Sequence, residues 1–414
     1  MSSTKGADRA NPSRTTTFSS LRNRDFRLYM AGSVSSSTGS WVLRIAQDWL
    51  VLSLTGSPAA VGLTIALQSL PTLLLTVPGG ALADRYPMRR IVQLSYAGFA
   101  VLAALLAALT LTQVVQAWHL QLIALGTGIT AALSTPARQV FVHELVGSTQ
   151  LRNAVSLNSA ALQLAGLIGP ALSGVLMGVA GVGWSFAITA ASYVVPILAL
   201  TRMRSEQVRT RPPQRARLRT GLRYAAQRPD ILWPTLLVSL FGLFTANLPV
   251  VLAPYAKDVF HSGASGYGLF NTVVAAGALL GALVSARLGR TRLRTLMAFA
   301  AALSLLYIAA AAATTQLVFC GILLSVGAAT MLVNASANST VQLASPPTMR
   351  GRVMALYVLT YYTATTAGAP IAGTLIEHLG PRPYLLLAGG AQATICLLIT
   401  ARLAIARSWA HPMT

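Results

Sequence analysis

Long apolar segments alternate with short polar gaps along this chain, and the basic residues occupy almost only every second gap. Of the 31 Lys and Arg residues, 28 lie in this one set of gaps, while Lys257 and Arg382 fall in the other set and Arg44 lies within an apolar segment. The basic gaps are 5–27, 85–90, 138–152, 202–228, 287–294, 350–352 and 402–407. Short loops rich in Lys and Arg stay on the cytoplasmic side of a membrane. The pattern therefore predicts an even number of membrane spans with both termini in the cytoplasm.

The composition excludes an ordinary soluble domain. Hydrophobic residues make up 54% of the chain and charged residues only 10%, whereas soluble domains carry about 25% charged residues. A net charge of +22 would also suit a nucleic-acid binder, but such a protein gathers its cations on one soluble face. Here the charges punctuate hydrophobic segments, so we expect loops beside anionic lipid and no nucleic-acid partner. Cys320 and Cys396 lie in apolar stretches and are expected to be free thiols.

Twelve segments are long and apolar enough to span a membrane. A helix of about 20 apolar residues crosses the roughly 30 Å of hydrocarbon, and these segments lack the alternation of barrel strands. They lie near 28–54, 58–82, 90–113, 118–140, 153–178, 183–201, 231–256, 265–287, 293–313, 316–341, 352–376 and 384–405. We therefore expect an all-α membrane protein of twelve transmembrane helices, a monomer in the plasma (inner) membrane.

A repeat divides these spans into two sets of six. The longest gap is rich in Arg and contains Pro212 and Pro213, as expected of a cytoplasmic linker. At an offset near 200, Gln47 matches Asn247, Arg152 matches Arg352 and Pro170 matches Pro370. Four such echoes, including 83–90 with 286–293, favour two six-helix pseudo-repeats around a central cavity. The expected parts are a tail at 1–27, a half at 28–201, a linker at 202–230, a half at 231–405 and a tail at 406–414.

The loop after the second span carries the most specific motif. It reads Gly80-Ala-Leu-Ala-Asp84-Arg85-Tyr-Pro-Met-Arg89-Arg90 and resembles the pattern Gly-x-Leu-x-Asp-Arg-x-Gly-Arg-Arg of the major facilitator superfamily. Pro87 and Met88 depart from it. A carboxylate at Asp84 suits a helix N-terminus, while the arginines hold the loop at the lipid surface. The resemblance implies a latch between the halves that stabilises an outward-open state; a loop that only fixes topology is the alternative.

A second resemblance lies in the fifth span. Gly166, Gly169, Pro170 and Gly174 are similar to part of the glycine-proline motif of drug-exporting branches of the superfamily. Small residues at this spacing also let two helices approach closely, so plain packing explains them as well. The stretches 49–57, 68–71 and 346–354 further resemble bacterial exporters of siderophores and macrolides.

Arg44 and Asp48 are the only ionisable residues that we place in the interior of a span, away from its ends. A charge at the centre of a bilayer costs about 2.5 to 3.5 kcal/mol on insertion scales, so this pair needs a reason to exist. Their spacing of four places them on one helix face, within reach of each other, in a stripe with Ser33, Ser37 and Ser40 that we expect to face the cavity. Asp48 is the candidate proton carrier and Arg44 the cation that favours its ionised form; a structural ion pair is the alternative.

Other polar and aromatic residues within the spans are candidates to line the cavity. Singly, each polar residue is more often a contact between helices than a ligand contact, and Trp41 would supply apolar surface for an amphipathic molecule. The candidates are Ser37, Ser40, Trp41, Gln47, Gln68, Gln163, Asn247, Asn271, Asn334, Asn338, Tyr357 and Tyr361. No phosphate-binding loop, nucleophile motif or metal-ligand spacing is found, so we expect no cofactor, no metal and no enzymatic activity.

These observations predict a secondary active transporter. The resemblance implies alternating access of two halves, and the buried acid suggests proton coupling. We expect an exporter whose small-molecule substrates are drugs or amphipathic metabolites, with protons as the coupling ion. A facilitator or importer of the same fold is one alternative, and a membrane sensor that transports nothing is another.

Overall fold

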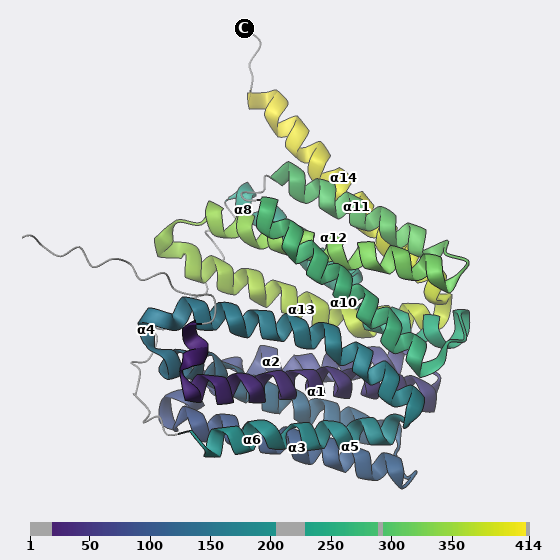
Figure 1. Ribbon diagram of the computed structural model, residues 1–414. Coiled ribbons are helices and arrows are strands. Elements are labelled where there is room, and N and C mark those ends of the chain that lie inside the picture. Colours follow the sequence, from purple (N-terminus) through teal and green to yellow (C-terminus); the bar gives the residue numbers. More distant parts are fainter. Residues whose placement is uncertain (1–18, 204–227, 289–292, 411–414) are drawn as a thin grey trace, which may run out of the picture.

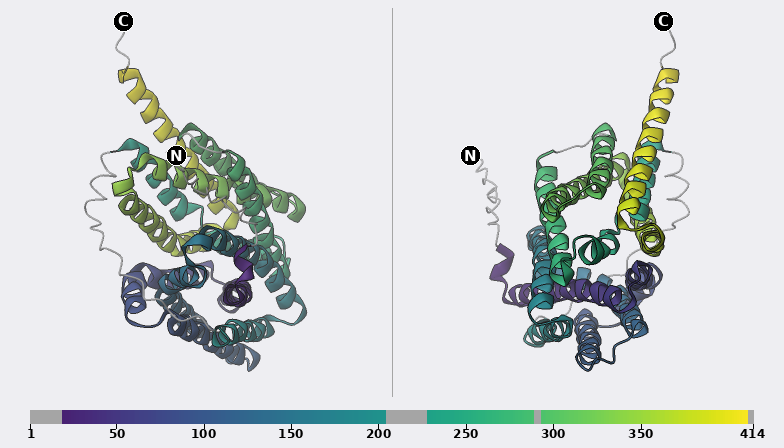
Figure 2. Two further views of the ribbon diagram at one scale, coloured as in Figure 1. Left: turned by 60° about the vertical axis from the view of Figure 1, so that its left-hand side comes forward. Right: turned by 90° about the vertical axis from the view of Figure 1, so that its right-hand side faces the viewer.

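The computed structural model describes residues 19–203, 228–288 and 293–410, and these form helices joined by short turns, with no strand among them. The N-terminal half contains a short 3-10 turn (Ser19–Arg22), α1 (Arg24–Thr55), α2 (Pro58–Arg85), α3 (Met88–Leu111), α4 (Ala117–Val179), α5 (Val182–Ser192) and α6 (Val194–Thr201). The C-terminal half contains α8 (Pro229–Phe244), α9 (Leu248–Pro254), the π-helical turn η2 (Tyr255–Val259), α10 (Gly263–Leu288), α11 (Leu293–Ala311), α12 (Gln316–Ala344), α13 (Pro347–Leu379) and α14 (Pro381–Ala410). Figures 1 and 2 show the two groups of helices stacked on each other.

The all-α membrane fold predicted from the sequence is confirmed. Within the described residues, ten helical segments are long and apolar enough to cross a membrane. The two predicted spans outside this set, 28–54 and 352–376, lie in α1 and α13, which form continuous helices of 32 and 33 residues. Both are rich in serine, threonine or charge and pack against helices on several sides. These polar residues lower the hydropathy of α1 and α13 below that of the other spans.

The distribution of side chains is that of a protein in lipid. Large apolar side chains such as Val179 and Leu317 are 85% and 83% exposed, whereas Gln47, Asp48 and Gln392 are almost completely buried. Lipid tails accept the exposed leucines and valines without cost, while polar groups find partners only between helices. The polar residues therefore mark the interior of the bundle.

Three helix breaks depart from the simplest expectation for the spans. The predicted gap between spans four and five is helical, and α4 continues through it with one interruption at Gly147, where φ is 67° and ψ is 179°. A glycine adopts this conformation without the steric cost that other residues meet. The other two breaks, near Tyr193 and Thr245, each precede a proline in the same predicted span.

Each of these two prolines frees a carbonyl that another helix then satisfies. Pro196 has no N–H to donate to the carbonyl of Ser192, and the Ser35 hydroxyl of α1 donates to that carbonyl at 2.9 Å. In the same way Pro249 leaves the carbonyl of Thr245 free, and the Tyr307 hydroxyl of α11 donates to it. Such side-chain donors are how helices in lipid tolerate proline.

The connections between helices define two ends of the bundle. One end holds the α2–α3 turn, Gly147 and the α12–α13 turn. We call it the basic end, because the arginine-rich gaps lie there. The opposite end, here called the far end, holds the α1–α2, α4–α5, η2–α10 and α13–α14 turns.

The two halves meet along two pairs of helices. One pair is α2 with α13 and the other is α4 with α10. Glycine lets the backbones touch: a Cβ on Gly62 would lie 2.3 Å from the carbonyl oxygen of Ala369, and one on Gly373 would lie 2.5 Å from that of Pro58. Close backbone approach of this kind is the usual basis of helix association in membranes.

Candidate functional site

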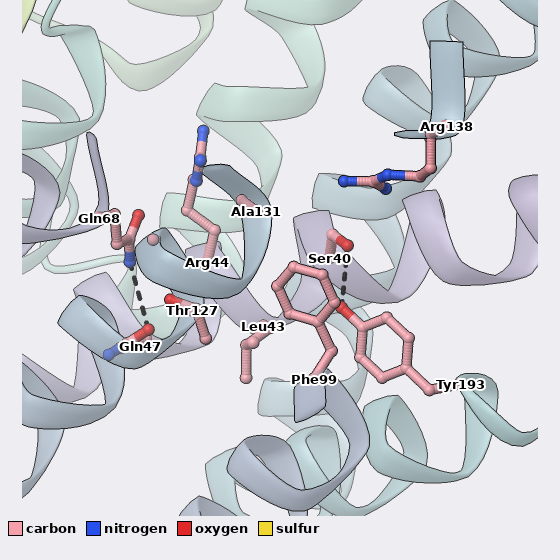
Figure 3. A pocket seen from close by; sticks show the side chains of 11 residues that line it. Ser40, Leu43, Arg44, Gln47, Gln68, Phe99, Thr127, Ala131, Arg138 and Tyr193 are labelled. Carbon is pink, nitrogen blue, oxygen red and sulfur yellow. Dashed lines mark hydrogen bonds between the residues drawn. The ribbon is translucent and has the colours of Figure 1, made fainter. Parts of the chain in front are cut away.

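A cavity of about 150 Å³ opens within the N-terminal half (Figure 3). Its walls come from α1, α2, α3, α4 and the α5–α6 junction. The lining residues are Ser40, Leu43, Arg44, Gln47, Gln68, Phe99, Thr127, Gly128, Ala131, Arg138 and Tyr193. The structure thus brings four of the candidates, Ser40, Arg44, Gln47 and Gln68, to one site.

Two side-chain pairs hold the walls of this cavity. The hydroxyls of Ser40 and Tyr193 lie 2.8 Å apart, and the Tyr193 ring stacks on Phe99 with ring centroids 5.5 Å apart. On the other side, Gln68 Nε2 donates to Gln47 Oε1 at 3.2 Å, and Gln47 Nε2 donates to the carbonyl of Leu120 at 2.7 Å. Gln68 Oε1 is buried and accepts no hydrogen bond. The cavity therefore offers an aromatic wall and one unused acceptor.

Arg44 and Asp48 do not form the ion pair that their spacing allows. No nitrogen of Arg44 lies within 4.0 Å of the Asp48 carboxylate. Arg44 is exposed to the cavity, with its guanidinium over the Trp41 ring at 5.6 Å from the centroid. Asp48 is fully buried and points away from the cavity lining. The expected polar stripe is thus split, because Ser40 and Arg44 face water while Ser33 and Asp48 are buried.

Asp48 lies where the two halves meet. The Tyr267 hydroxyl of α10 donates to Asp48 Oδ2 at 3.4 Å, and the Tyr267 ring stacks on Trp49 with centroids 6.0 Å apart. Asp48 Oδ1 has no hydrogen-bond partner. A buried ionised carboxylate is costly unless hydrogen bonds satisfy it, so this acid is held in a position where gain or loss of a proton changes the stability of the contact between the halves.

Arg138 is a second cation of the cavity that the sequence reasoning did not select. It lies on α4, lines the cavity and donates to Ser134 Oγ at 3.2 Å. The sequence pattern places it in the basic gap 138–152. The helix continues for nine more residues to Gly147, so Arg138 lies inside the bundle and not in a loop. Its place within the predicted span 118–140 was the signal that could have identified it.

The glycine-proline motif of α4 contacts two different partners. A Cβ on Gly169 would lie 2.3 Å from the Cβ of Trp41, and Gly166 faces the same indole ring. Gly174 instead faces Gly268 of α10, in the other half. Trp41 is therefore packed against this motif and does not line the cavity.

The remaining candidates are distributed over the C-terminal half and the outer parts of α1 and α4. Asn247 donates to the carbonyls of Gly242 and Thr365, and Asn271 donates to that of Tyr267. The side-chain amides of these two residues therefore bond to the helix backbones of the bundle. Asn334 and Asn338 line a second cavity of about 550 Å³ with Arg350, at the basic end of α12 and α13. The other candidates line neither of these two cavities: Ser37, Gln163, Tyr357 and Tyr361, like Trp41, Asn247 and Asn271.

The loop motif lies at the basic end, and its described residues are accessible. Gly80 has open space around its Cα, Arg85 and Arg90 are exposed, and Arg89 is half-buried. The side chain of Asp84 lies outside the part of the chain that the structure describes, so the latch stays a prediction.

At the far end, two charged residues of the C-terminal half hold the α1–α2 turn. Lys257 Nζ donates to the carbonyl of Leu52 at 3.2 Å, at the C-terminus of α1. Glu377 Oε2 accepts from the Ser57 hydroxyl and, at 3.2 Å, from the backbone N–H of Ala59, at the N-terminus of α2. Each charge matches the helix end that it contacts. The Ser57 and Ala59 hydrogen bonds lower the pKa of Glu377 below its usual range.

Comparisons with solved structures identify the fold. A bacterial homologue of the human lysosomal transporter Spinster, in an inward-facing and unoccupied conformation, superposes with a TM-score of 0.67 at 14% identity and covers 95% of this chain and 96% of that one. A bacterial homologue of the iron transporter ferroportin, in an inward-facing state, gives 0.67 at 18% identity and covers 90% and 98%.

Sequence comparisons identify the family. The profile described as transmembrane secretion effector matches residues 15–412. The enterobactin exporter EntS of Citrobacter koseri is 25% identical over 397 residues, which cover 94% of each chain. The staphyloferrin A transporter of Staphylococcus aureus is 26% identical over 258 residues, which cover 59% of this chain and 63% of the relative, less than two thirds of its length. The resemblance read from the loop motif is confirmed, and the chain belongs to the transmembrane secretion effector family, as a multi-pass transporter of the major facilitator superfamily and not an enzyme.

Proposed function

We propose that this protein exports small amphipathic molecules across the plasma (inner) membrane, that siderophore-like compounds are among them, and that protons drive the export. The observation that carries the proposal is the position of Asp48, a buried acid that joins the two halves through Tyr267 one helical turn from a polar cavity. The name of the enterobactin exporter supports the direction of transport and the kind of cargo, and that of the staphyloferrin A transporter supports the kind of cargo.

The contacts between the halves support alternating access. Lys257 and Glu377 hold the far end closed, and Gly174 and Gly268 touch there. Ser40 and Arg44, near the middle of α1, are exposed to water in the cavity. If the basic end is cytoplasmic, as the distribution of arginines predicts, this conformation receives cargo from inside the cell. Rocking of the halves would then separate the far-end contacts and release the cargo outside.

The partners of Asp48 support proton coupling. In the present conformation Tyr267 covers the carboxylate and water is excluded. Separation of the halves at the far end would remove Tyr267 and expose Asp48 to the outside, where the proton concentration is higher in a respiring cell. A protonated Asp48 is less costly to bury than an ionised one, so proton uptake from outside would favour the return to the far-end-closed conformation.

The test is transport by the purified full chain in proteoliposomes with an imposed pH gradient, across a panel of siderophores, macrolides and lipophilic cations. We expect accumulation of at least one class against its gradient, and loss of accumulation when an ionophore removes the pH gradient. Movement of cargo that is indifferent to the pH gradient would identify a facilitator. No movement of any compound under either condition would contradict the proposal and favour a sensor.

A further inference from the structure

Arg44 and Arg138 bring two like charges to one small cavity (Figure 3). In the figure both guanidinium groups lie above the Gln47, Thr127 and Tyr193 side chains, which line the cavity together with apolar residues such as Leu43 and Phe99. The contacts of both cations are uncharged: Arg44 lies over the Trp41 ring, and Arg138 donates to the Ser134 hydroxyl. Among the residues that the structure describes, no acidic side chain lines this cavity.

Asp48, one helical turn from Arg44, is engaged elsewhere, because it is buried against Tyr267 in the contact between the halves. Cations within a membrane span are costly unless water or an anion solvates them, and two cations facing one space also repel each other. An anion in the cavity would remove both costs.

We propose that Arg44 and Arg138 form a paired-arginine site that binds the carboxylate of an aromatic acid, either a small molecule or one acidic arm of a larger cargo. The inference rests on the proposed function, because it assigns the chemical class of the molecule that enters the transporter. A guanidinium presents parallel N–H donors that match the two oxygens of a carboxylate, and two arginines from different helices fix its position.

The other walls of the cavity favour an aromatic ring on this acid. The stacked Phe99 and Tyr193 rings offer a flat apolar surface, and the unpartnered Gln68 Oε1 would accept a hydrogen bond from a hydroxyl or amide on the ring. A cavity of about 150 Å³ is the size that accommodates benzene in a protein interior. Sites for whole drug-sized ligands are about 300 Å³ or larger, so only one ring-sized group fits in this conformation.

The experiment compares three probes of nearly equal size and different charge. Benzoate, benzamide and benzylammonium are titrated against the full chain in nanodiscs of neutral lipid, without a pH gradient, and their binding is followed by ligand-observed NMR. We expect benzoate to bind at least about tenfold more tightly than benzamide, because charge-assisted hydrogen bonds are the stronger class, and benzylammonium to bind least. Equal binding of benzoate and benzamide would overturn the proposal.

Variants locate the site. Arg44→Gln and Arg138→Gln should each weaken benzoate binding by about tenfold, and the double variant should lower it to the level of benzamide. Arg44→Lys, which keeps the charge, should retain a preference for benzoate and shows that the loss is not a folding defect. Arg350→Gln is the matched control, since Arg350 is an exposed cation that lines the second cavity. A loss in Arg350→Gln as large as in Arg44→Gln would also overturn the proposal.

The acidic group could also belong to a lipid headgroup, so the titration is repeated in nanodiscs that contain phosphatidylglycerol. Unchanged benzoate affinity supports a soluble acid, whereas its abolition there would assign the site to anionic lipid and contradict the proposal. This binding assay is independent of energy coupling. Failure of transport with intact benzoate preference would therefore reject the proposed function alone, and transport without that preference would reject the paired-arginine site alone.

Discussion

Gly174 of α4 and Gly268 of α10 touch across the contact between the two halves so closely that a Cβ on Gly268 would lie 2.3 Å from the Cα of Gly174. Nothing but glycine fits at position 268 without movement of one helix. The pair belongs to different halves and lies toward the far end, so a side chain there acts directly on the distance between the halves.

The first prediction is that Gly268→Ala opens the far end. An added methyl group in a closely packed contact costs about 1 to 3 kcal/mol, and separation of the halves relieves this cost. Since 1.4 kcal/mol is a factor of ten in an equilibrium constant, we expect the open population to rise by about tenfold. Pulsed EPR distances between labels at Thr112 and His261, in a background without Cys320 and Cys396, measure the two populations. Gly390→Ala is the control, because open space surrounds Gly390; an equal shift in both variants would contradict the prediction.

The second prediction concerns pH at the far end. Because hydrogen bonds from Ser57 and Ala59 lower the pKa of Glu377, the contact is complete above the ordinary value of 4.5 and is lost as the pH falls below it. In an Asp48→Asn background, where protonation of Asp48 does not contribute, the same EPR distances should therefore lengthen on acidification, and Glu377→Gln should show the longer distance already at pH 7. Other charged or ionisable side chains at this end include His378, Lys257 and Asp258. His378→Gln should leave the transition unchanged, and a transition that disappears with His378 would assign it to the imidazole.

The third prediction tests the packing of Trp41 on α4. A Cβ at Gly169 would lie 2.3 Å from the Cβ of Trp41, within one half of the protein. Gly169→Ala should lower the free energy of unfolding by about 1 to 3 kcal/mol and lower the melting temperature in detergent. It should not open the far end, because the contact does not join the halves. Gly321→Ala, at a helical position with open space, should be neutral or slightly stabilising; a matching loss there would show that any alanine destabilises these helices.

The fold was predictable because the spans are long and their charges alternate in a simple pattern. Hydrophobic length locates a helix in lipid, and the predicted spans 28–54 and 352–376 lie in continuous helices, α1 and α13, although these two carry many polar residues and are not among the ten most apolar segments. Gly147 shows where it fails: a polar gap in the sequence was read as a loop, yet the backbone stays helical except at one glycine. Local sequence does not distinguish an interrupted helix from a loop when both are polar.

The site was less predictable because it depends on which helix covers each residue. A spacing of four predicted that Arg44 and Asp48 share a face, but Tyr267 of the other half covers Asp48 while the cavity exposes Arg44. Arg138 was missed for the opposite reason, since its sequence neighbours resemble a loop and only the path of α4 places it in the cavity. Contacts between distant segments decided both cases.

The fourth prediction concerns orientation and follows from the distribution of basic residues. A single cysteine that replaces Arg85, at the basic end, should react with a membrane-impermeant reagent only from the cytoplasm. A single cysteine that replaces Ser262, at the far end, should react with it only from outside. Both positions lie in or next to turns between helices, so the labels reach solvent. Labelling of Arg85→Cys in intact cells would reverse the orientation and, with it, the direction in which the cavity receives cargo.

The fifth prediction assigns energy coupling to Asp48. Asp48→Asn should abolish pH-driven accumulation but spare downhill exchange, because the neutral amide mimics only the protonated acid, and the Tyr267 hydroxyl can still donate to its oxygen.

Arg44→Ala removes a nearby cation that favours the ionised carboxylate, so the pH dependence of transport should move to higher pH. Arg44 and Asp48 make no direct ion pair in this conformation, so Arg44→Ala should fold and express as well as the wild type. A loss of expression that the double substitution restores would instead indicate a structural pair.

Tyr267→Phe serves as the matched control, since it keeps the ring on Trp49 and removes only the hydroxyl that contacts Asp48. We expect a change in the pH dependence of transport and no loss of coupling. Accumulation at the wild-type level in Asp48→Asn would place proton coupling elsewhere in the protein.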